Sequence, residues 1–266
     1  MKIQPVNIND LNEIVKLQPE GWEDIGSHFQ FYIKSTFCKP YKYVINKTIA
    51  GIGAVIFYKN TAWLAHIIVR PENRNKGIGK LIVKHLTDDV KKTGCSSILL
   101  IATDLGEPVY LKSGFRIVSN YLVFKREEQI KKINIDPHVV SFINEYADDI
   151  LKTDLEITGE DRSNLIFPVL KSAGLYVKKN KILGYYIPQL NEGPVISKTS
   201  EAGISLMNYK YSAATKVVLP EQNKTGIDYL KNAGFIETSR LKRMILGNDI
   251  AWKPEFIYSR IGGNFG

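Results

Sequence analysis

The sequence predicts an α/β protein made of two tandem halves. Its 266 residues, of which 44% are hydrophobic, can bury one large core or two small ones, and this length weakly favours two domains. Both halves alternate short apolar strand patterns with helical patterns. Both also reach the same dipeptide near their ends, Gly114-Phe115 and Gly234-Phe235. This repeated order favours two copies of one fold over a single large domain.

The first half reads as a series of strands between helices. A strand is expected over Met1–Val6, a helix from Asn9 or Asp10 to Lys16, and a second helix over His28–Thr36. Strands follow at Tyr41–Ile45, Ile49–Tyr58 and Thr61–Val69, with turns at Asn46-Lys47 and Lys59-Asn60. Close strands joined by short turns predict an antiparallel meander. A helix from Gly77 to about Lys92, a strand over Ser96–Thr103, a short helix ending at Gly114 and a strand over Phe115–Phe124 complete this half.

The second half repeats this order after a charged segment, Lys125–Lys132, that suits a surface link. Asp136-Pro137 is expected to start an amphipathic helix, with apolar residues at 139, 142, 143, 146, 147 and 150. The later elements are a helix near Asp161–Ala173, strands at Leu175–Lys179, Ile182–Gln189 and Pro194–Lys198, a helix over Glu201–Ala213 and a strand over Lys216–Leu219. A shift of 120 residue numbers places Ile98 on Val218 and Gly106 on Gly226, which indicates an internal duplication.

A glycine-rich turn stands between the strand ending at Val69 and the helix after it. The strand breaks at Pro71, and the helix starts after Arg74, Gly77 and Gly79. The first N–H groups of a helix have no intrahelical partner, and the helix dipole places about half a positive charge at that end. Phosphate is therefore the expected ligand of this turn.

Two common phosphate-binding loops are excluded by the residues at this turn. A Walker loop needs a glycine where Arg74 stands and Ser or Thr after Gly-Lys, but Leu81 follows Lys80. A dinucleotide fingerprint needs a third glycine or an alanine at position 82, which is Ile82. Neither a nucleoside triphosphate nor a dinucleotide is predicted.

The pattern that remains, Arg74-x-x-Gly77-x-Gly79, resembles the pyrophosphate loop of the GNAT superfamily of acyl-CoA-dependent N-acyltransferases. Downstream, Tyr110-x-x-x-Gly114-Phe115 is similar to the late helix and following strand of that family. The resemblance implies an N-acetyltransferase that moves an acetyl group from acetyl-CoA to a primary amine by direct attack in a ternary complex. A non-catalytic acyl-CoA sensor and a basic nucleic-acid binder with a degenerate fold are the alternatives.

The second half resembles a GNAT-like domain appended to certain bacterial acetyltransferases. The matching pieces are Thr158–Arg162, Gly184-Tyr185, Gly193-Pro194 and Arg243-Met244 through Tyr258–Gly266. This resemblance implies two tandem GNAT-like domains, each a mixed, mostly antiparallel central sheet flanked by helices. Residues 1–128 would be the catalytic acyl-CoA-binding domain, and 133–266 a degenerate domain with an acceptor-binding or structural role. Residues 197–203 lack the glycine pattern, so a second phosphate cradle is not expected.

The resemblance also assigns the acyl-CoA site. The backbone at the end of the strand before the loop would meet the thioester and pantetheine, and the loop N–H groups would hold the pyrophosphate. The residues that this implies are Ile67, Ile68, Val69, Arg74, Asn75, Lys76, Gly77, Ile78, Gly79, Lys80, Asp104, Gly106 and Tyr110. Arg74 and Lys80 are equally compatible with a solvated surface.

Acetyl transfer needs a neutral amine and a protonated leaving thiol. Deprotonating an alkylammonium with a pKa near 10.4 costs about 4.6 kcal/mol at pH 7, so a base or a water relay helps. His66 is the candidate base, with Glu23 and Asp24 as rivals and a hydrogen-bonded core histidine as the alternative. Tyr110 is the candidate acid or hydrogen-bond donor for the thiolate; its alternative is a core aromatic.

The acceptor is the least defined part of the prediction. Residues that could line a pocket are Trp22, Asp161, Arg162, Tyr185 and Tyr186, although strand aromatics are often core and Asp161-Arg162 can start a helix. Amino acids, polyamines, sugar amines and protein amines all remain open. A pocket enclosed by two domains favours a small metabolite.

Composition narrows the partners and the compartment. The net charge is +9, but the 36 Lys and Arg are scattered and no aromatic-interleaved nucleic-acid motif occurs, so nucleic acid is not an expected partner. Part of the charge can steer the phosphates of coenzyme A. Two cysteines without ligand spacing give no disulfide framework and no metal site, and no signal peptide or membrane span is found, so a cytoplasmic protein is expected. The sequence gives no oligomeric state.

Overall fold

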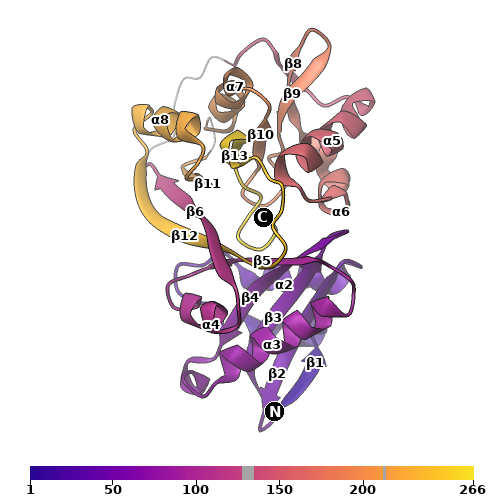
Figure 1. Cartoon of the computed structure of the whole chain (residues 1–266), viewed down its shortest axis with the longest axis vertical. Coiled ribbons are helices and arrows are strands. Elements are labelled where there is room, and N and C mark those ends of the chain that lie inside the picture. The colour runs from indigo at the N-terminus through magenta and orange to yellow at the C-terminus, as the bar shows by residue number, and fades with distance from the viewer. Residues whose placement is uncertain (128–134, 212–213) are drawn as a thin grey trace. The chain divides into compact units, whose positions relative to one another are not determined.

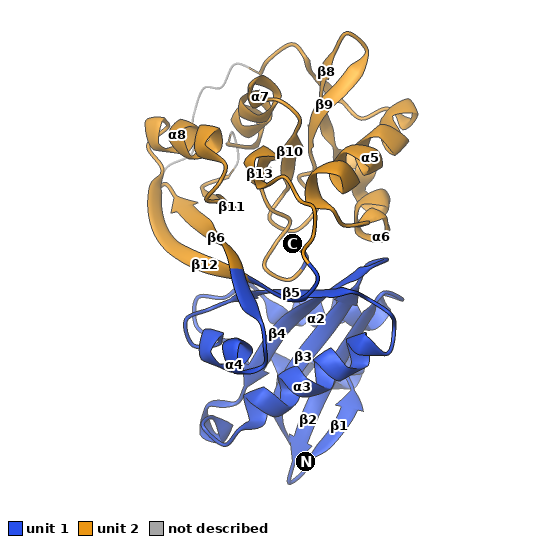
Figure 2. Cartoon of the chain, in the orientation of Figure 1, with its two compact units in different colours: residues 1–117, 244–248, 265 blue, residues 118–243, 249–264, 266 orange. Residues whose placement is uncertain are grey.

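The computed structural model describes residues 1–127, 135–211 and 214–266, and the chain divides into two compact units (Figure 2). Unit 1 comprises Met1–Ile117 together with Met244–Asn248 and Phe265. Unit 2 comprises Val118–Arg243, Asp249–Asn264 and Gly266. Each unit therefore contains chain from more than one region of the sequence.

Unit 1 contains five neighbouring strands of an eight-stranded sheet (Figure 1). In spatial order they are β1 (Lys2–Pro5), β2 (Cys38–Ile45), β3 (Thr48–Phe57), β4 (Thr61–Val69) and β5 (Ser97–Ala102). The pairs β1–β2, β2–β3 and β3–β4 are antiparallel and β4–β5 is parallel, so the expected mixed, mostly antiparallel sheet is confirmed. Asn46 and Lys47 both have positive φ, 48° and 65°, as the tight β2–β3 hairpin turn requires.

Four α-helices accompany this sheet. They are α1 (Leu11–Val15), α2 (Ile25–Lys34), α3 (Ile78–Lys91) and α4 (Glu107–Lys112), with 3₁₀ turns η1 (Ile8–Asp10) and η2 (Pro71–Asn73). Helix α3 buries one stripe of its surface, formed by Ile78, Ile82, Val83, Leu86 and Val90. This spacing places the apolar residues on one helical face, which packs into the main core of unit 1.

Asp10, one of the two expected capping residues, occupies the N-cap position of α1 but makes no side-chain capping bond to that helix. Asn7 caps the preceding turn η1, because its side chain accepts the Asn9 N–H and the Asp10 carboxylate accepts the Asn7 N–H. This reciprocal pair begins η1, and α1 follows from Leu11. The sequence therefore indicated the N-cap position of α1 and missed the 3₁₀ turn before it.

A short piece from late in the chain completes unit 1. The Asn248 N–H donates to the Ser96 carbonyl at 3.0 Å, and the Ser97 hydroxyl donates to the Asn248 carbonyl at 2.8 Å. The Tyr58 hydroxyl donates to the Phe265 carbonyl at 2.9 Å. These bonds tie the end of β12 (Ile236–Gly247) and Phe265 to the strands of unit 1.

Unit 2 contains a five-stranded antiparallel sheet. In spatial order its strands are β13 (Ile257–Ser259), β10 (Val195–Ser197), β9 (Lys181–Tyr186), β8 (Gly174–Lys178) and β7 (Val139–Ser141). Strand β11 (Lys216–Pro220) pairs with β6 (Arg116–Lys125), from Lys125 back to Tyr121. The helices are α5 (Ala147–Thr158), α6 (Ser163–Ile166), α7 (Ser200–Tyr211) and α8 (Lys224–Asn232), with 3₁₀ turns at Asn144–Tyr146, Phe167–Ser172 and Pro254–Phe256.

The helix expected from Asp136-Pro137 is wrong at its start. The Asp136 carboxylate accepts the His138 N–H at 2.9 Å, which forms a local turn, and Val139–Ser141 then pairs with β8. The β-branched pair Val139-Val140 favours a strand, and α5 starts only at Ala147. Part of the expected surface link and the end of the helix expected over Glu201–Ala213 lie outside the described residues, at 128–134 and 212–213.

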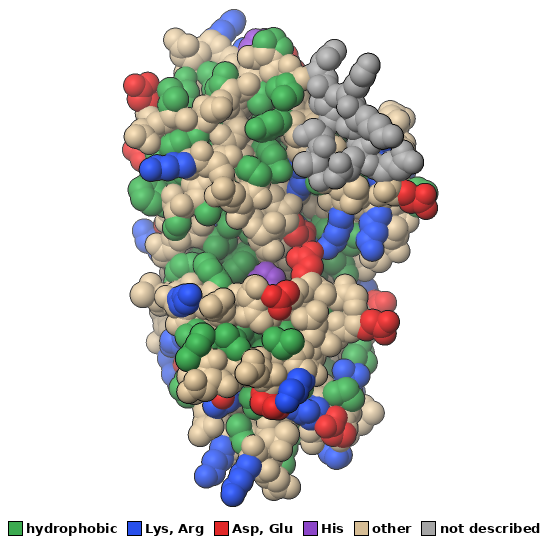
Figure 3. All heavy atoms as spheres, turned by 180° about the vertical axis from the view of Figure 1, so that it is seen from behind, with side chains coloured by type: hydrophobic (Ala, Val, Ile, Leu, Met, Phe, Trp, Pro, Cys, Tyr) green, Lys and Arg blue, Asp and Glu red, His purple; other side chains and the backbone are tan. Residues whose placement is uncertain are grey.

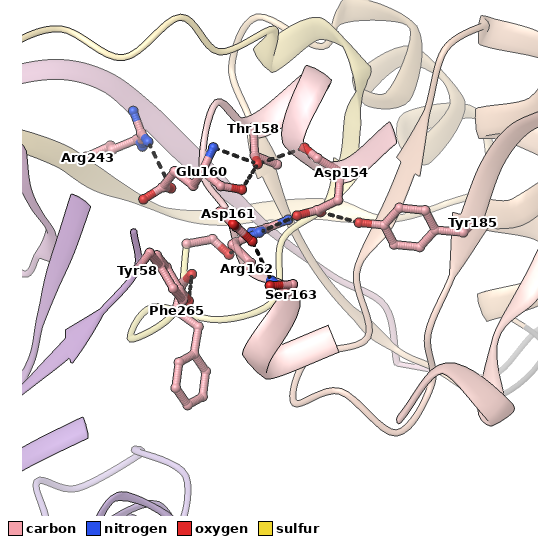
Figure 4. Close-up of polar contacts among 11 residues, drawn as sticks. Tyr58, Asp154, Thr158, Glu160, Asp161, Arg162, Ser163, Tyr185, Arg243 and Phe265 are labelled. Atoms are coloured by element: carbon pink, nitrogen blue, oxygen red, sulfur yellow. Dashed lines mark hydrogen bonds and ion pairs between the residues drawn. The ribbon is translucent and has the colours of Figure 1, made fainter. Parts of the chain in front are cut away.

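Unit 2 holds a buried ion pair in its interior (Figure 4). The Arg162 guanidinium donates to both carboxylate oxygens of Asp154, and the two side chains are 3% and 2% exposed. The Tyr185 hydroxyl also donates to Asp154. A third Arg162 N–H donates to the Gly266 carbonyl at 3.2 Å. Such a bidentate pair needs these further bonds to offset its desolvation.

The charged surface is mixed in sign. On the face shown in Figure 3, Lys and Arg side chains stand among Asp and Glu side chains and form no continuous basic band. In the described part of the chain, no helix is both long and apolar enough to span a membrane.

Candidate active site

Strand β4 separates from β5 part of the way along its length. The two strands pair in parallel only from Thr61 to Trp63, opposite Ser97 to Leu99. Beyond Trp63, β4 continues to Val69 and keeps β3 as its neighbour on the other side. Within residues 1–127, no β5 residue pairs with this part of β4, so the strand edge at 64–69 offers backbone N–H and C=O groups to a ligand.

A β-bulge reshapes β4 where the two strands have parted. Ala65 lies opposite Ala54 and Ile68 opposite Ile52, so His66 and Ile67 together face the single residue Gly53. His66 has φ 48°, a left-handed conformation that costs a non-glycine residue about 1–2 kcal/mol. A bulge of this kind redirects one side chain of the strand, and here that side chain is the predicted His66.

The loop after β4 has the backbone features of an anion site. Asn75 and Gly77 both have positive φ, 59° and 77°. The Arg74 guanidinium Nε donates back to the Val69 carbonyl at 3.1 Å, and the Lys76 ammonium donates to the Glu72 carbonyl at 2.9 Å. The predicted loop side chains therefore brace the turn, while its residues 74–77 stay exposed.

The first turn of α3 is open to a ligand. No side chain caps it within the described residues, and the first helical bond runs from the Leu81 N–H to the Gly77 carbonyl. The N–H groups of residues 78–80 precede that bond, so they are the unsatisfied donors that favour an anion. A Cβ at Gly79 would lie 3.8 Å from Val69 and 4.0 Å from Val109. The end of β4, the start of α3 and α4 thus converge at Gly79, where Val69 and Val109 lie at ordinary contact distance.

Helix α4 also carries Tyr110, which is buried. Tyr110 is 8% exposed, contacts Phe115 edge to face at 6.0 Å and shares a core cluster with Ile78, Ile82 and Phe115. A Cβ at Gly106 would lie only 2.8 Å from the Tyr110 ring, so glycine is needed there for this ring position. Burial raises the pKa of the Tyr110 phenol, which keeps it protonated at neutral pH. Asp104, between β5 and α4, is exposed.

An aromatic cluster surrounds His66 on the side of α2. The Tyr32 hydroxyl is 2.9 Å from His66 Nδ1, and the His28 ring centroid is 4.8 Å from that of His66. Phe29 and Trp22 contact the same imidazole at 5.9 and 6.1 Å. The sequence did not indicate His28 and Tyr32; the only available signal was their spacing of four residues, which places both on one face of a helix.

The environment of His66 determines its protonation. Burial, followed by the charge of His28, lowers the pKa of His66 from 6.5 to about 3. A neutral imidazole of such low basicity is a poor acceptor for the proton of an alkylammonium. These values favour a neutral, hydrogen-bonding His66 over a general base.

Asp24, a rival base, caps a helix instead. Its carboxylate accepts the N–H groups of Gly26 and Ser27, at 2.9 and 3.3 Å, and the Ser27 hydroxyl. The Ser27 hydroxyl bond and then the Gly26 N–H lower the pKa of Asp24. A carboxylate held in this way starts α2, and it is a weak proton acceptor.

The residues predicted for the acceptor pocket fall into separate places. Trp22 lies at the His66 cluster of unit 1 and is 38% exposed. In unit 2, Arg162 and Tyr185 meet at Asp154 and are buried, and Asp161 accepts the Ser163 N–H at 3.2 Å. Tyr186 contacts the Tyr209 ring at 5.7 Å. Among the contacts of the described residues, Trp22 is the one predicted pocket residue that meets a predicted catalytic residue, His66.

The depressed pKa of His66 predicts acid sensitivity. Between pH 6.5 and about 3 the unfolded chain binds a proton at His66 that the folded chain does not, so stability falls as the pH decreases through this window. Between pH 7.5 and 5 the loss is at most about 2 kcal/mol. In His66→Asn, a residue that tolerates positive φ, this component should vanish. Denaturant unfolding of both proteins at the two pH values measures the difference; parallel pH profiles would contradict it.

Comparison with known proteins identifies related families for both regions. Residues 9–115 match the model of the Acetyltransferase (GNAT) family, and residues 150–259 match a model described as an Acetyltransferase (GNAT) domain. The first match spans the β4 bulge, the glycine loop, Tyr110 and Phe115. No group of three or more His, Cys, Asp or Glu that could hold a metal occurs among the residues described.

Individual relatives extend over most of the chain. An uncharacterized N-acetyltransferase of Bacillus subtilis is 24% identical over 253 residues, which are 85% of this chain and 88% of that protein. A proposed acetyltransferase from Pyrococcus horikoshii has a similar structure, with a TM-score of 0.82 at 20% identity over 100% of this chain and 95% of that one. A tandem GNAT protein from the clavulanic acid biosynthesis pathway gives 0.60 at 12% identity, over 92% and 98%. At these identities the two structures establish the fold.

Proposed function

Because the chain belongs to the GNAT acetyltransferase family and is an acyltransferase with two GNAT regions, we propose that it transfers the acetyl group of acetyl-CoA to a primary amine of a small metabolite. The observation that carries this proposal is one continuous feature of unit 1. The open edge of β4 leads directly into the glycine loop and the uncapped first turn of α3. An extended thioester with a pyrophosphate at one end fits this order of groups.

Binding of acetyl-CoA is assigned to backbone groups. The N–H groups from Asn75 to Lys80 hold the pyrophosphate, and each charge-assisted hydrogen bond contributes about 1.5–3 kcal/mol. Several such bonds outweigh the helix dipole, which contributes about 0.3–1 kcal/mol. Arg74 and Lys80 add positive charge at the exposed rim, and the β4 edge at Ile67–Val69 meets the pantetheine and thioester.

The proposed transfer is a single displacement. The amine loses its ammonium proton to water, and its nitrogen then attacks the acetyl carbonyl carbon to form the C–N bond. The C–S bond breaks, and the thiolate takes a proton or a hydrogen bond from the Tyr110 phenol. The second amine proton passes through water to the sulfur, or to the Tyr110 phenolate where that group has given up its own proton, so that amide, thiol and neutral phenol remain. Tyr110 suits this role because burial keeps its phenol protonated.

The acceptor is assigned to the side of β4 that carries the bulge. His66, held by Tyr32 and in contact with the tilted ring of His28, presents a neutral imidazole there, and Trp22 is the exposed ring of the cluster. We propose residues 1–128 as the acyl-CoA-binding domain and 133–266 as a domain with an acceptor-binding or structural role. This division is supported by the glycine loop and the uncapped first turn of α3, which both lie within residues 1–128.

A panel of amines tests the proposal. The purified chain is incubated with acetyl-CoA and amino acids, polyamines, sugar amines or peptides, and free thiol and intact product mass are followed. The proposal expects thiol release that depends on one acceptor class, with a product about 42 Da heavier than that acceptor, because an acetyl group replaces one hydrogen. Acetyl-CoA binding without thiol release across the panel would favour the sensor alternative instead.

Gly79→Ala tests the binding site without disturbing the fold. The new methyl group meets nothing nearer than 3.8 Å in the free protein, and alanine favours a helix over glycine by up to about 1 kcal/mol. The substitution is expected to leave stability unchanged or improved, yet to weaken acetyl-CoA binding at least about tenfold, because it fills the space that the pyrophosphate needs to approach the backbone.

Isothermal titration calorimetry with acetyl-CoA measures the affinity, and thermal unfolding measures the stability. Gly263→Ala is a matched control, since a Cβ there likewise makes only ordinary contact, 3.6 Å from the nearest atom, which belongs to Arg260. If Gly79→Ala bound acetyl-CoA with undiminished affinity, the first turn of α3 would not belong to the acyl-CoA site.

A further inference from the structure

Unit 2 repeats the elements that form the acyl-CoA site of unit 1. Strand β10, helix α7, strand β11 and helix α8 follow one another in the order of β4, α3, β5 and α4. In unit 1 the ligand opening lies between β4 and β5. The equivalent position in unit 2 is the space between β10 and β11.

Strand β13 fills that position. Val195 and Ile196 of β10 pair antiparallel with Ser259 and Ile257 of β13. On its other side, the Arg260 N–H, next after β13, donates to the Val218 carbonyl of β11 at 3.0 Å (Figure 1). The backbone groups of β10 that correspond to the open edge of β4 are therefore used by the chain itself.

The start of α8 adds another bond to β13. The Asn223 amide donates to the Ile257 carbonyl at 3.0 Å, while its oxygen caps α8 by accepting the Gly226 N–H at 2.7 Å. Asn223 is 1% exposed. Helix α8, which corresponds to α4, thus contacts β13 at the position where α4 would border a ligand in unit 1.

The side chains of β13 take up the remaining space. Tyr258 is 1% exposed, and its ring lies against Gly203 of α7, where a Cβ would be only 2.3 Å away. In unit 1 a Cβ at Gly79 of α3 would make only ordinary contact, 3.8 Å from Val69 and 4.0 Å from Val109. An aromatic ring therefore packs against a glycine of α7, whereas the glycine of α3 meets two valine side chains and no ring.

A buried lysine fastens β13 to the neighbouring loop. Lys210 of α7 is 2% exposed, and its ammonium donates to the Ser259 hydroxyl at 2.6 Å and to the carbonyls of Glu192 and Gly193, both at 2.5 Å. The Arg260 guanidinium, just after β13, donates to both oxygens of Glu192. Displacing β13 would take the Ser259 hydroxyl from the buried Lys210 and strain the adjoining Arg260–Glu192 pair, at a cost in stability.

The phosphate loop is also missing from unit 2. Only residues 198 and 199 connect β10 to α7, whereas residues 70–77 connect β4 to α3. Side-chain hydroxyls already accept backbone N–H groups at the start of α7. The Thr199 N–H donates to the Ser197 hydroxyl at 3.1 Å, and the Ala202 N–H to the Thr199 hydroxyl at 3.3 Å.

We infer that β13 acts as a built-in substitute for the ligand in unit 2, so that this unit binds no acyl-CoA although it matches an acetyltransferase domain model, and the chain binds one acyl-CoA. The inference rests on the proposed acyl-CoA site of unit 1 for its stoichiometry. The occupation of the position between β10 and β11 by Ile257–Ser259 stands on the contacts above.

Hydrogen exchange of the full chain tests this directly. Without ligand, the amides of residues 195–197 and 257–259 should already exchange slowly. Acetyl-CoA should slow exchange at residues 67–69 and 75–80 and leave 195–197 and 257–259 unchanged. Fast exchange of 257–259 in the free protein, or new protection at 195–197 on adding acetyl-CoA, would overturn the inference.

Native mass spectrometry and calorimetry supply the stoichiometry. One acetyl-CoA per chain is expected, and Gly79→Ala should weaken all of the binding. A second equivalent, or a remaining site with unchanged affinity in Gly79→Ala, contradicts the inference. If the unsubstituted chain binds no acetyl-CoA at all, the proposed function is contradicted. The rate of hydrogen exchange at residues 257–259 in the free protein then still decides whether β13 occupies the position between β10 and β11.

Discussion

Tyr110→Phe is expected to lower the turnover of acetyl transfer about 100-fold while acetyl-CoA affinity changes less than about twofold. A positioned acid or hydrogen-bond donor contributes roughly 10²–10⁴ in rate. The ring of Tyr110 packs against Phe115 in the core, and phenylalanine keeps this contact. What is lost is the hydroxyl group, which acts on the departing sulfur and hardly on the bound ground state.

Steady-state kinetics and calorimetry separate the two effects. Tyr41→Phe is the matched control, because it removes a tyrosine hydroxyl from the same unit that donates to Asp89 at 2.8 Å, outside the proposed site. That variant should lose about 1 kcal/mol of stability and keep its turnover. If Tyr110→Phe turned over at the unsubstituted rate, the sulfur would need another proton source.

Asp154→Ala is expected to destabilise the protein by about 3–5 kcal/mol. It leaves the Arg162 guanidinium, 3% exposed, without its bidentate partner, and removes the acceptor of the Tyr185 hydroxyl (Figure 4). Burial, together with the charge of Asp154, raises the pKa of Tyr185 well above its usual value, so this phenol stays protonated and needs an acceptor.

Denaturant midpoints followed by circular dichroism measure this loss. Asp149→Ala, on the exposed face of the same helix, is the control and should cost less than about 1 kcal/mol. The double variant Asp154→Leu with Arg162→Met should recover part of the loss, since it removes both charges. A single-variant effect no larger than that of Asp149→Ala would show that Asp154 and Arg162 are not a buried pair in solution.

The parts of the site that the sequence revealed are those encoded locally. Gly77 has φ 77°, which favours glycine, and Gly106 makes room for the Tyr110 ring, so short motifs could indicate the loop and α4. The hairpin turn at Asn46-Lys47 was readable for the same reason. In such places the residue type itself reports the backbone geometry.

The parts that the sequence could not reveal depend on distant pairing. Residues 64–68, Leu-Ala-His-Ile-Ile, read as an uninterrupted apolar strand, and the bulge at His66 arises only from its register with β3. Tyr32 contacts His66 because α2 packs near β4, and no local sequence pattern predicts that packing. Strand β13 is three residues long, and its partner β10 precedes it by about sixty residues, so no periodicity could place it.

The late residues of unit 1 have a consequence for how the protein is made. Residues 244–248 and Phe265 belong to this unit, and Asn248 bonds to the backbone at Ser96. As the chain leaves the ribosome from its N-terminus, unit 1 cannot finish its sheet until almost the whole polypeptide has been synthesised. Contacts between residues about 150 positions apart also slow folding, because a long loop must close first. A fragment that ends at residue 128 lacks these pieces, so unit 1 is expected to be completed only after residues 244–248 and Phe265 have emerged, although most of it is translated first.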